Sequence, residues 1–194
     1  MKTAFKILSI ITVLSLFSCS DGTIKIASGD RTEFVEFPDG STAYLNKNSF
    51  VEFAEAFEER FVKQEGEVFF VVKKGKSPFI VSTESGEIHV LGTKFNVKSD
   101  KDLLEVEVEK GSVELRVNKL VKKIKKGQKA LFKDVEKTFK ITKAELKHKN
   151  WVRKLNKEMK KLEREIKKSS KKIEKDVKKI GKKLNSELNK LEKN

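Results

Sequence analysis

Alternating apolar and polar residues mark the stretch 78–97 as three short strands. Such alternation places apolar side chains on one face of a half-buried sheet. Ser85-Gly86 and Gly92-Thr93 separate the three runs, because glycine and small polar residues favour turns. The apolar positions that define the pattern are Val81, Ile88, Val90, Phe95 and Val97.

The same pattern continues on both sides and predicts a mainly β chain with an all-β domain. Turn signals recur roughly every 8 to 12 residues, the spacing of a sandwich, barrel or solenoid of about a dozen short strands. Pattern alone leaves these three architectures open. A strand is predicted at 67–72, and its continuous apolar run 68–72 is typical of a strand buried on both faces. The other predicted strands are 24–26, 34–37, 42–45, 49–53, 60–64, 104–109, 113–117, 121–124 and 129–132.

Five glycines fall where one predicted strand gives way to the next. Glycine adopts backbone conformations closed to other residues and allows a neighbouring backbone to approach closely. We therefore expect these glycines to shape turns rather than to bind a ligand. They are Gly40, Gly66, Gly92, Gly111 and Gly127.

A helical pattern replaces the strands at the C-terminal end, after a predicted linker at residues 134–149. Apolar residues recur at steps of three and four through 150–194, which predicts one long amphipathic α-helix. Ser169 and Ser170 fill the one gap in the apolar stripe. Its members are Val152, Leu155, Met159, Leu162, Ile166, Ile173, Val177, Ile180, Leu184, Leu188 and Leu191.

The excess positive charge lies almost entirely in this C-terminal region. Residues 137–194 contain 22 Lys and Arg against 8 Asp and Glu, whereas the preceding residues are nearly balanced. An amphipathic helix must bury its stripe, and three partners remain open: a second copy in a coiled coil, the β domain, or an anionic lipid or lipopolysaccharide surface. Nucleic acid is not expected, because Trp151 is the helix's one aromatic residue that could stack on a base.

The N-terminal residues are predicted to form a signal peptide at 1–18 followed by a lipid-modified cysteine. Lys2 and Lys6 precede an apolar run of 11 residues, too short to cross a bilayer, which takes roughly 20. The sequence Leu16-Phe17-Ser18-Cys19 resembles a bacterial lipobox, in which the cysteine sulfur carries diacylglycerol. An ordinary secretory cleavage that leaves a free thiol is the alternative. We expect an exported protein, anchored through Cys19 at the periplasmic face or the cell surface, with residues 19–30 as tether and first strand.

The β region resembles the FecR domain family through several motifs in the family's order. They are FPDGSTAYLNKNSFVEF, RFVKQEGEVFFVV, PFIVST, VLGTKFNV, VEVEKGSVEL and KKGQKALF, within residues 31–133. Family members are known as transmembrane regulators that relay a signal from an outer-membrane receptor to a sigma factor. We expect no counterpart of the family's cytoplasmic segment, because only residues 1–6 precede the apolar run. A lysine-rich helix stands where the family usually has a receptor-contacting part.

The residues give no indication of an enzyme, a cofactor or a metal site. The two histidines, His89 and His148, are far apart in sequence, and His89 is expected to be an ordinary strand residue. Glu105, Glu107 and Glu109 share one strand face, which predicts a solvated surface. Two functions remain: a binding or scaffolding lipoprotein of the cell envelope that recognises a protein or glycan, and an accessory component of envelope signal transduction.

Overall fold

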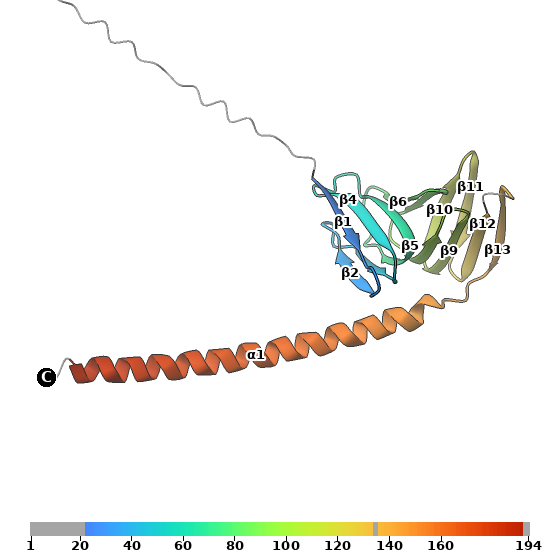
Figure 1. Ribbon diagram of the computed structural model, residues 1–194. Coiled ribbons are helices and arrows are strands. Elements are labelled where there is room, and N and C mark those ends of the chain that lie inside the picture. The colour runs from blue at the N-terminus through green and yellow to red at the C-terminus, as the bar shows by residue number, and fades with distance from the viewer. Residues whose placement is uncertain (1–21, 134–135, 192–194) are drawn as a thin grey trace, which may run out of the picture.

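The computed structural model describes residues 22–133 and 136–191, which form thirteen β-strands and one helix (Figure 1). This confirms the predicted mainly β fold with a single long C-terminal helix. The strands are β1 (Thr23–Ala27), β2 (Glu33–Glu36), β3 (Thr42–Leu45), β4 (Phe50–Ala54), β5 (Phe61–Val71), β6 (Phe79–Thr83), β7 (Gly86–Val90), β8 (Lys94–Ser99), β9 (Leu103–Lys110), β10 (Ser112–Val117), β11 (Leu120–Lys125), β12 (Gln128–Lys133) and β13 (Thr138–Lys143), and the helix is α1 (His148–Leu191).

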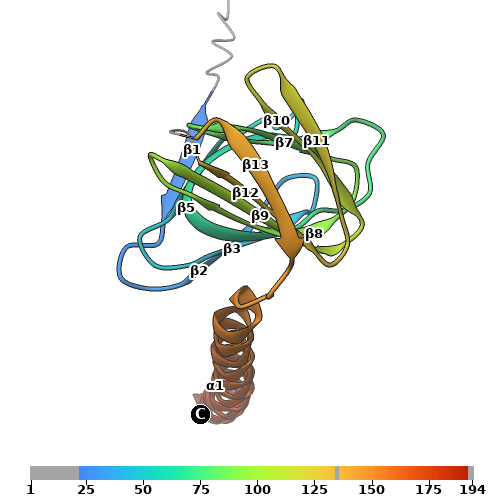
Figure 2. The same ribbon diagram turned by 90° about the vertical axis from the view of Figure 1, so that its right-hand side faces the viewer.

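The strands form one sheet that curls into a half-barrel, so that two layers face each other (Figure 2). One layer has the order β1-β4-β5-β6-β7-β10-β11 and the other β2-β3-β5-β8-β9-β12-β13. The long strand β5 belongs to both layers. Among the described strands, β5 and β6 pair in parallel and every other pair is antiparallel. Of the architectures that the sequence pattern left open, the structure has a curled half-barrel.

Strand β5 is continuous, which corrects the prediction of two strands around Glu65 and Gly66. Its first half pairs with β4 and its second half with β3, so the strand bends between the layers at Gly66. Gly66 has a φ of 84°, and a Cβ there would lie 2.4 Å from Ser49 Oγ. Glycine is required at this bend because it tolerates both the positive φ and the close approach.

Phenylalanine rings fill the space between the two layers. Phe37 stacks on Phe57 with ring centroids 5.3 Å apart, and Phe70 stacks on Phe95 at the same distance. Phe79 meets Phe37 edge to face at 5.5 Å. Aromatic pairs of these geometries add about 0.5–1.5 kcal/mol beyond the burial of their area. The chain has a single cysteine, so no disulfide within it supplements this core.

The buried side chain of Arg60 ties three loops together beside the core. Its Nε and Nη2 each lie 2.8 Å from Asp39 Oδ2. The guanidinium also donates to the carbonyl oxygens of Ser77 and Lys73, at 2.6 and 2.8 Å. Asp39 in turn accepts hydrogen bonds from the amide and the hydroxyl of Ser41. The aspartate of this turn therefore holds the turn and the arginine together.

Strand β13 lies within residues 134–149, where a linker was predicted. It pairs with β12 from Gln128 opposite Lys143 to Lys133 opposite Thr138. Mostly Lys and Thr, the strand shows too little apolar alternation to be predicted on its own. It forms an edge of the sheet, where exposed lysines discourage pairing with other chains. Likewise β1 pairs with β4, so the β domain extends beyond the predicted 31–133 at both ends.

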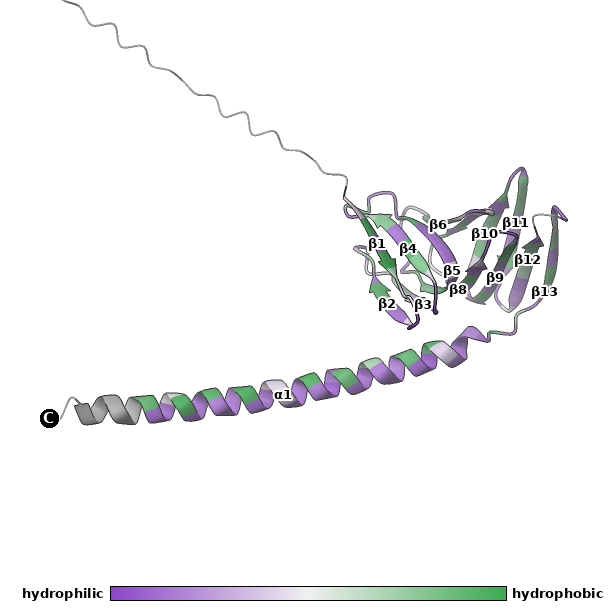
Figure 3. Cartoon of the chain, in the orientation of Figure 1, coloured by the Kyte–Doolittle hydropathy of each residue, from purple (hydrophilic) through white to green (hydrophobic). Residues whose placement is uncertain are grey.

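Helix α1 begins at His148, two residues before the predicted start, and runs away from the β domain (Figure 3). Near its beginning Leu155 is buried, at 7% exposure. Farther along, the apolar stripe faces solvent. Its members there are Leu162, Ile166, Ile173, Val177, Ile180 and Leu184, each 57% to 64% exposed. Of the three partners left open for the stripe, the β domain covers only the first turns.

Candidate functional site

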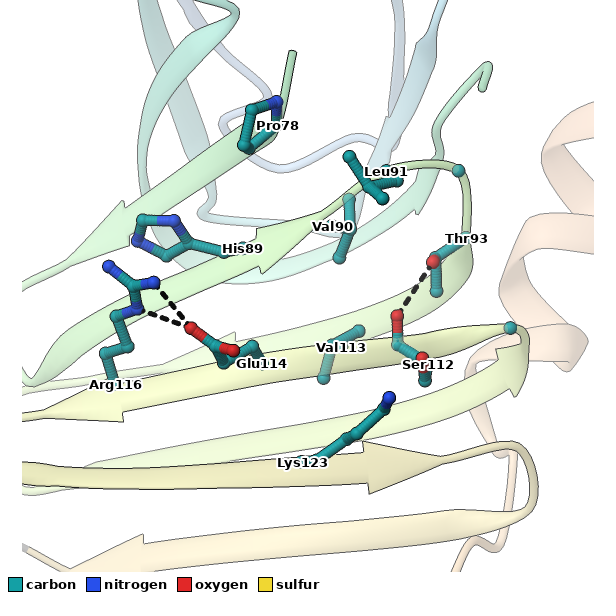
Figure 4. Close-up of a pocket in the computed structure, with 12 residues that line it drawn as sticks. Pro78, His89, Val90, Leu91, Thr93, Ser112, Val113, Glu114, Arg116 and Lys123 are labelled. Carbon is teal, nitrogen blue, oxygen red and sulfur yellow. Dashed lines mark hydrogen bonds and ion pairs between the residues drawn. The ribbon is translucent and has the colours of Figure 1, made fainter. Parts of the chain in front are cut away.

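A cleft of about 470 Å³ opens where β7 and β10 diverge (Figure 4). The two strands pair at three positions, and the pairing ends with His89 opposite Glu114. Beyond that pair the cleft is lined by the ends of both strands and by the loop that carries Gly92 and Thr93. Strand divergence thus creates a slot along the sheet, with backbone on both sides.

Charged and polar side chains stand at the two ends of this cleft. At one end Arg116 contacts Glu114 Oε1 through Nε and Nη2, at 2.7 and 2.6 Å, near His89 (Figure 4). At the other end Thr93 Oγ1 donates to the carbonyl oxygen of Ser112 at 3.0 Å. Apolar walls with a few polar groups are typical of binding sites. The lining also includes Pro78, Leu91, Val113 and Lys123.

A second feature is the junction between the outer face of the sheet and the start of α1. The His148 ring stacks on Phe69 with centroids 4.5 Å apart and an interplanar angle of 20°. This contact covers the outer side of the continuous apolar run in β5, so the prediction that the run is buried on both faces is confirmed at Phe69. About two helical turns after His148, Tyr44 Oη donates to Asn156 Oδ1 at 3.4 Å.

Glu67 is the polar hub of this junction. One carboxylate oxygen, Oε2, accepts a hydrogen bond from Asn46 Nδ2 at 2.7 Å. The other, Oε1, accepts from Asn96 Nδ2 at 3.1 Å and from Trp151 Nε1 at 3.3 Å. The Trp151 indole of α1 is thereby held against the sheet by Glu67, which Asn46 and Asn96 from two other segments position. This arrangement fixes the direction in which the helix leaves the domain.

The carboxylate of Glu107 is buried beneath the segment that enters the helix. Burial raises its pKa, but the neighbouring His148 ring, the hydrogen bond from the Glu145 amide and the positive charge of Lys129 outweigh burial and hold the pKa below its usual value. The Glu145 amide donates at 2.8 Å, and His148 Nδ1 lies 3.6 Å from Glu107 Oε2. His148 Nε2 lies 3.3 Å from Glu109 Oε2. Two carboxylates from one strand face thus flank one histidine.

These contacts correct the prediction that Glu105, Glu107 and Glu109 form a solvated surface. Glu107 is only 3% exposed and His148 only 1%. The chain after β13 folds back over this face, which the local sequence does not reveal. Glu105 takes part differently, because its carboxylate lies 3.4 Å from Lys129 Nζ. The sequence signal that could have revealed the burial of Glu107 is His148 itself. It is an imidazole at the start of a helix, and the structure packs it against β9, a strand rich in glutamate.

The structure places four of the five predicted glycines between strands. Gly40 joins β2 to β3, Gly92 joins β7 to β8, Gly111 joins β9 to β10 and Gly127 joins β11 to β12. Gly66 lies inside β5 and is not at a turn. Gly92 and Gly111 also line the cleft, so two glycines expected to have only a backbone role border the candidate site.

The other predicted positions fall in different places. His89 is a strand residue whose Nε2 lies 2.8 Å from Glu87 Oε2, and it borders the cleft. Cys19 lies outside the described residues.

Within residues 22–133 and 136–191, no group of three or more His, Cys, Asp or Glu side chains is placed to hold a metal ion. In the same part of the chain, no helix has the length and apolarity needed to cross a membrane.

Comparison with known proteins identifies the β region. Residues 22–114 match the family model described as FecR protein. Two crystal structures of a candidate anti-sigma factor from Parabacteroides distasonis, at 2.50 and 1.65 Å resolution, are 27% identical to this chain with a TM-score of 0.59. The matches cover 62% of this chain and 60% and 59% of the others, so this chain spans less than two thirds of their length. A search of curated proteins found no match.

The curled sheet is therefore a β module of the kind that these candidate anti-sigma factors contain. Residues 22–114, slightly less than half of the chain, match the FecR protein family. The predicted family resemblance is confirmed, and the matched region begins earlier than the quoted motifs, because it includes β1. The match ends within β10, so β11, β12, β13 and α1 lie outside it.

Proposed function

We propose that this protein is a non-enzymatic binding module of bacterial envelope signal transduction. Its FecR domain, shared with candidate anti-sigma factors, is the observation that carries the proposal. The lipobox-like sequence at Leu16–Cys19 supports an exported chain that a lipid on Cys19 holds at a membrane. A diacylated or triacylated cysteine anchors a protein stably, whereas one acyl chain does so only marginally.

The cleft between β7 and β10 is the proposed partner site. The proposed occupant is an extended segment of another protein that lies along the diverging strands, a mode in which main-chain hydrogen bonds supply affinity. The charged end at Glu114 and Arg116 and the apolar Leu91, 54% exposed, would then select the partner's side chains. A protein segment fits this lining better than a glycan, because the cleft's one aromatic ring is the imidazole of His89.

A scaffolding role in the envelope is the second candidate function. The helix favours it, because α1 runs away from the β domain with most of its apolar stripe exposed. In this alternative the domain and helix bind separate partners and no transcriptional signal passes through the protein.

Transcript profiling of a deletion strain tests the signalling proposal. We expect a defined set of envelope-stress or uptake transcripts to change, and the wild-type chain to restore them. A cleft variant with Leu91→Ser and Arg116→Ala should fail to restore them, while accumulating to the wild-type level. The matched control is Val121→Ser with Lys122→Ala, an exposed apolar and cationic pair on β11 outside the cleft lining. Unchanged transcripts in the deletion strain would eliminate signalling and leave the scaffold.

A further inference from the structure

The apolar stripe of α1 has the same spacing when read in either direction from the bond between Ser169 and Ser170. Ile166 and Ile173 stand equally far from this bond, and so do Leu162 and Val177. The next two pairs, Met159 with Ile180 and Leu155 with Leu184, continue the symmetry. At about 100° per residue, all eight side chains fall within roughly 30° of one line along the helix. The stripe is thus a spatial palindrome with two small residues at its centre.

From this palindrome we propose that α1 pairs with α1 of a second copy in an antiparallel coiled coil. A two-fold axis that passes beside Ser169 and Ser170 brings Leu162 onto the partner's Val177 and Ile166 onto the partner's Ile173. The same axis repeats both contacts in reverse, since a two-fold interface is self-complementary. Serines at the crossing allow the two backbones to approach closely. All four apolar residues are exposed in the single chain, at 57% to 63%.

Charged residues beside the stripe favour a protein helix over an anionic membrane. All acidic residues of α1 up to Leu184 lie within about 90° of the stripe's centre, at 100° per residue. They are Glu158, Glu163, Glu165, Glu174 and Asp176. Between Met159 and Leu184, every Lys and Arg except Lys183 lies more than 90° from the centre of the stripe, toward the opposite face of the helix. Insertion of the stripe among anionic headgroups would bring carboxylates nearest to the lipid and turn most lysines toward water, which opposes binding.

The start of the helix favours the antiparallel arrangement over the parallel one. Leu155 belongs to the stripe and is already buried beside the helix's own β domain. In a parallel pair both β domains would therefore compete for the same side of the same end.

This geometry makes the dimer a rod with one β domain at each end. At 1.5 Å per residue, the two Leu155 positions are about 45 Å apart along the rod. Each domain then presents its cleft independently. The inference does not depend on the proposed signalling function, because it uses only residues of α1.

Disulfide trapping tests the direction of the pair. Two full-length chains in a Cys19→Ala background, one with Leu162→Cys and one with Val177→Cys and a different tag, are mixed and oxidised. We expect a mixed disulfide dimer and little dimer from either chain alone, because the two Leu162 positions lie about 22 Å apart along an antiparallel pair. Self-linking of the Leu162→Cys chain through a parallel pair would overturn the proposal.

Sedimentation equilibrium tests whether the stripe carries the association. The full chain with Cys19→Ala should show a concentration-dependent dimer, and Ile166→Asn with Ile173→Asn should be monomeric. The matched control, Lys168→Asn with Lys175→Asn, loses at least as much helix propensity on the opposite face and should still dimerise. A wild-type chain that stays monomeric at hundreds of micromolar would overturn the proposal. A wild-type chain that is monomeric and binds phosphatidylglycerol vesicles, together with a stripe variant that does not bind them, would also overturn the proposal.

Discussion

His148 stacks its imidazole on the ring of Phe69 with centroids 4.5 Å apart, joining the first residue of α1 to the C-terminal part of β5. The same imidazole lies between Glu107 and Glu109 of β9. One side chain therefore links the helix to two strands. The direction of α1 depends on this contact and on the Glu67 hub that holds Trp151.

Replacement of His148 by alanine should loosen the helix base. The loss of the ring removes the stack on Phe69 and one partner of the buried Glu107, which we expect to cost about 1–3 kcal/mol. Hydrogen exchange should show faster amide exchange in residues 148–156, with the core of the sheet little changed. Lys157→Ala, at an exposed position on α1, is the control, with an effect within about 0.5 kcal/mol. Equal protection of the helix base in both variants would contradict the proposed role of His148.

Stability should fall with acid through Glu107. Although burial raises its pKa, its hydrogen bonds and Lys129 lower the pKa in the folded state below about 4.5, its usual value. A lowered folded-state pKa contributes stability above the unfolded-state value, and this stability is lost as pH falls through the folded-state pKa. His148, Lys129 and Glu145 face this carboxylate. Denaturant unfolding of Glu107→Gln between pH 6 and 3 should have a smaller pH slope than wild type.

Glu55→Gln is the control for that slope, because Glu55 is exposed in the loop between β4 and β5. It should retain the wild-type slope. If the Glu107 and Glu55 variants have equal slopes, Glu107 is not the group that couples acid to unfolding.

Arg60→Met should destabilise the fold strongly. The substitution keeps the apolar stem but leaves Asp39 without the guanidinium that contacts it at 2.8 Å. Removal of one partner from a buried ion pair costs about 3–5 kcal/mol. Arg116→Met breaks an exposed pair with Glu114 and should cost at most about 1 kcal/mol. Chemical denaturation of the two variants measures the difference, and similar losses would contradict the structural role of Arg60.

Gly66→Ala and Gly127→Ala separate backbone strain from steric conflict. Both glycines have a positive φ, 84° and 79°. Alanine at either position should cost about 1–2 kcal/mol for the left-handed conformation. At Gly127 no atom lies within 4 Å of the added Cβ, whereas at Gly66 the Cβ would meet Ser49. The Gly66 variant should therefore lose about 1–3 kcal/mol more, by thermal or chemical unfolding.

Cys19→Ala should release the chain from membranes. The lipid expected on this sulfur is the proposed anchor, so cell fractionation should move the protein to the soluble fraction. Incorporation of labelled fatty acid should disappear at the same time. Ser18→Ala keeps a small residue before the cysteine and should behave as wild type. Unlabelled wild-type protein in the membrane fraction would show that another feature anchors it.

The sequence by itself determined the order and type of most elements. Alternation over five or six residues, as in Val113, Leu115 and Val117 of β10, is a local property that a chain shows before it folds. The 3.6-residue period of α1 is local in the same sense. The FecR motifs added the family, because their order along the chain is also written in the sequence. The palindromic spacing of the stripe could be read there too.

Only the tertiary structure decided which of these surfaces are covered. The alternation at Glu107 predicts a solvent-facing side chain, and it is the segment before α1, 38 residues later, that buries it. The cleft exists because β7 and β10, distant in sequence, pair for three positions and then diverge. Gly66 lies in a bend because β5 changes partners there. Such outcomes depend on contacts between remote segments, and local propensity contains no information about them.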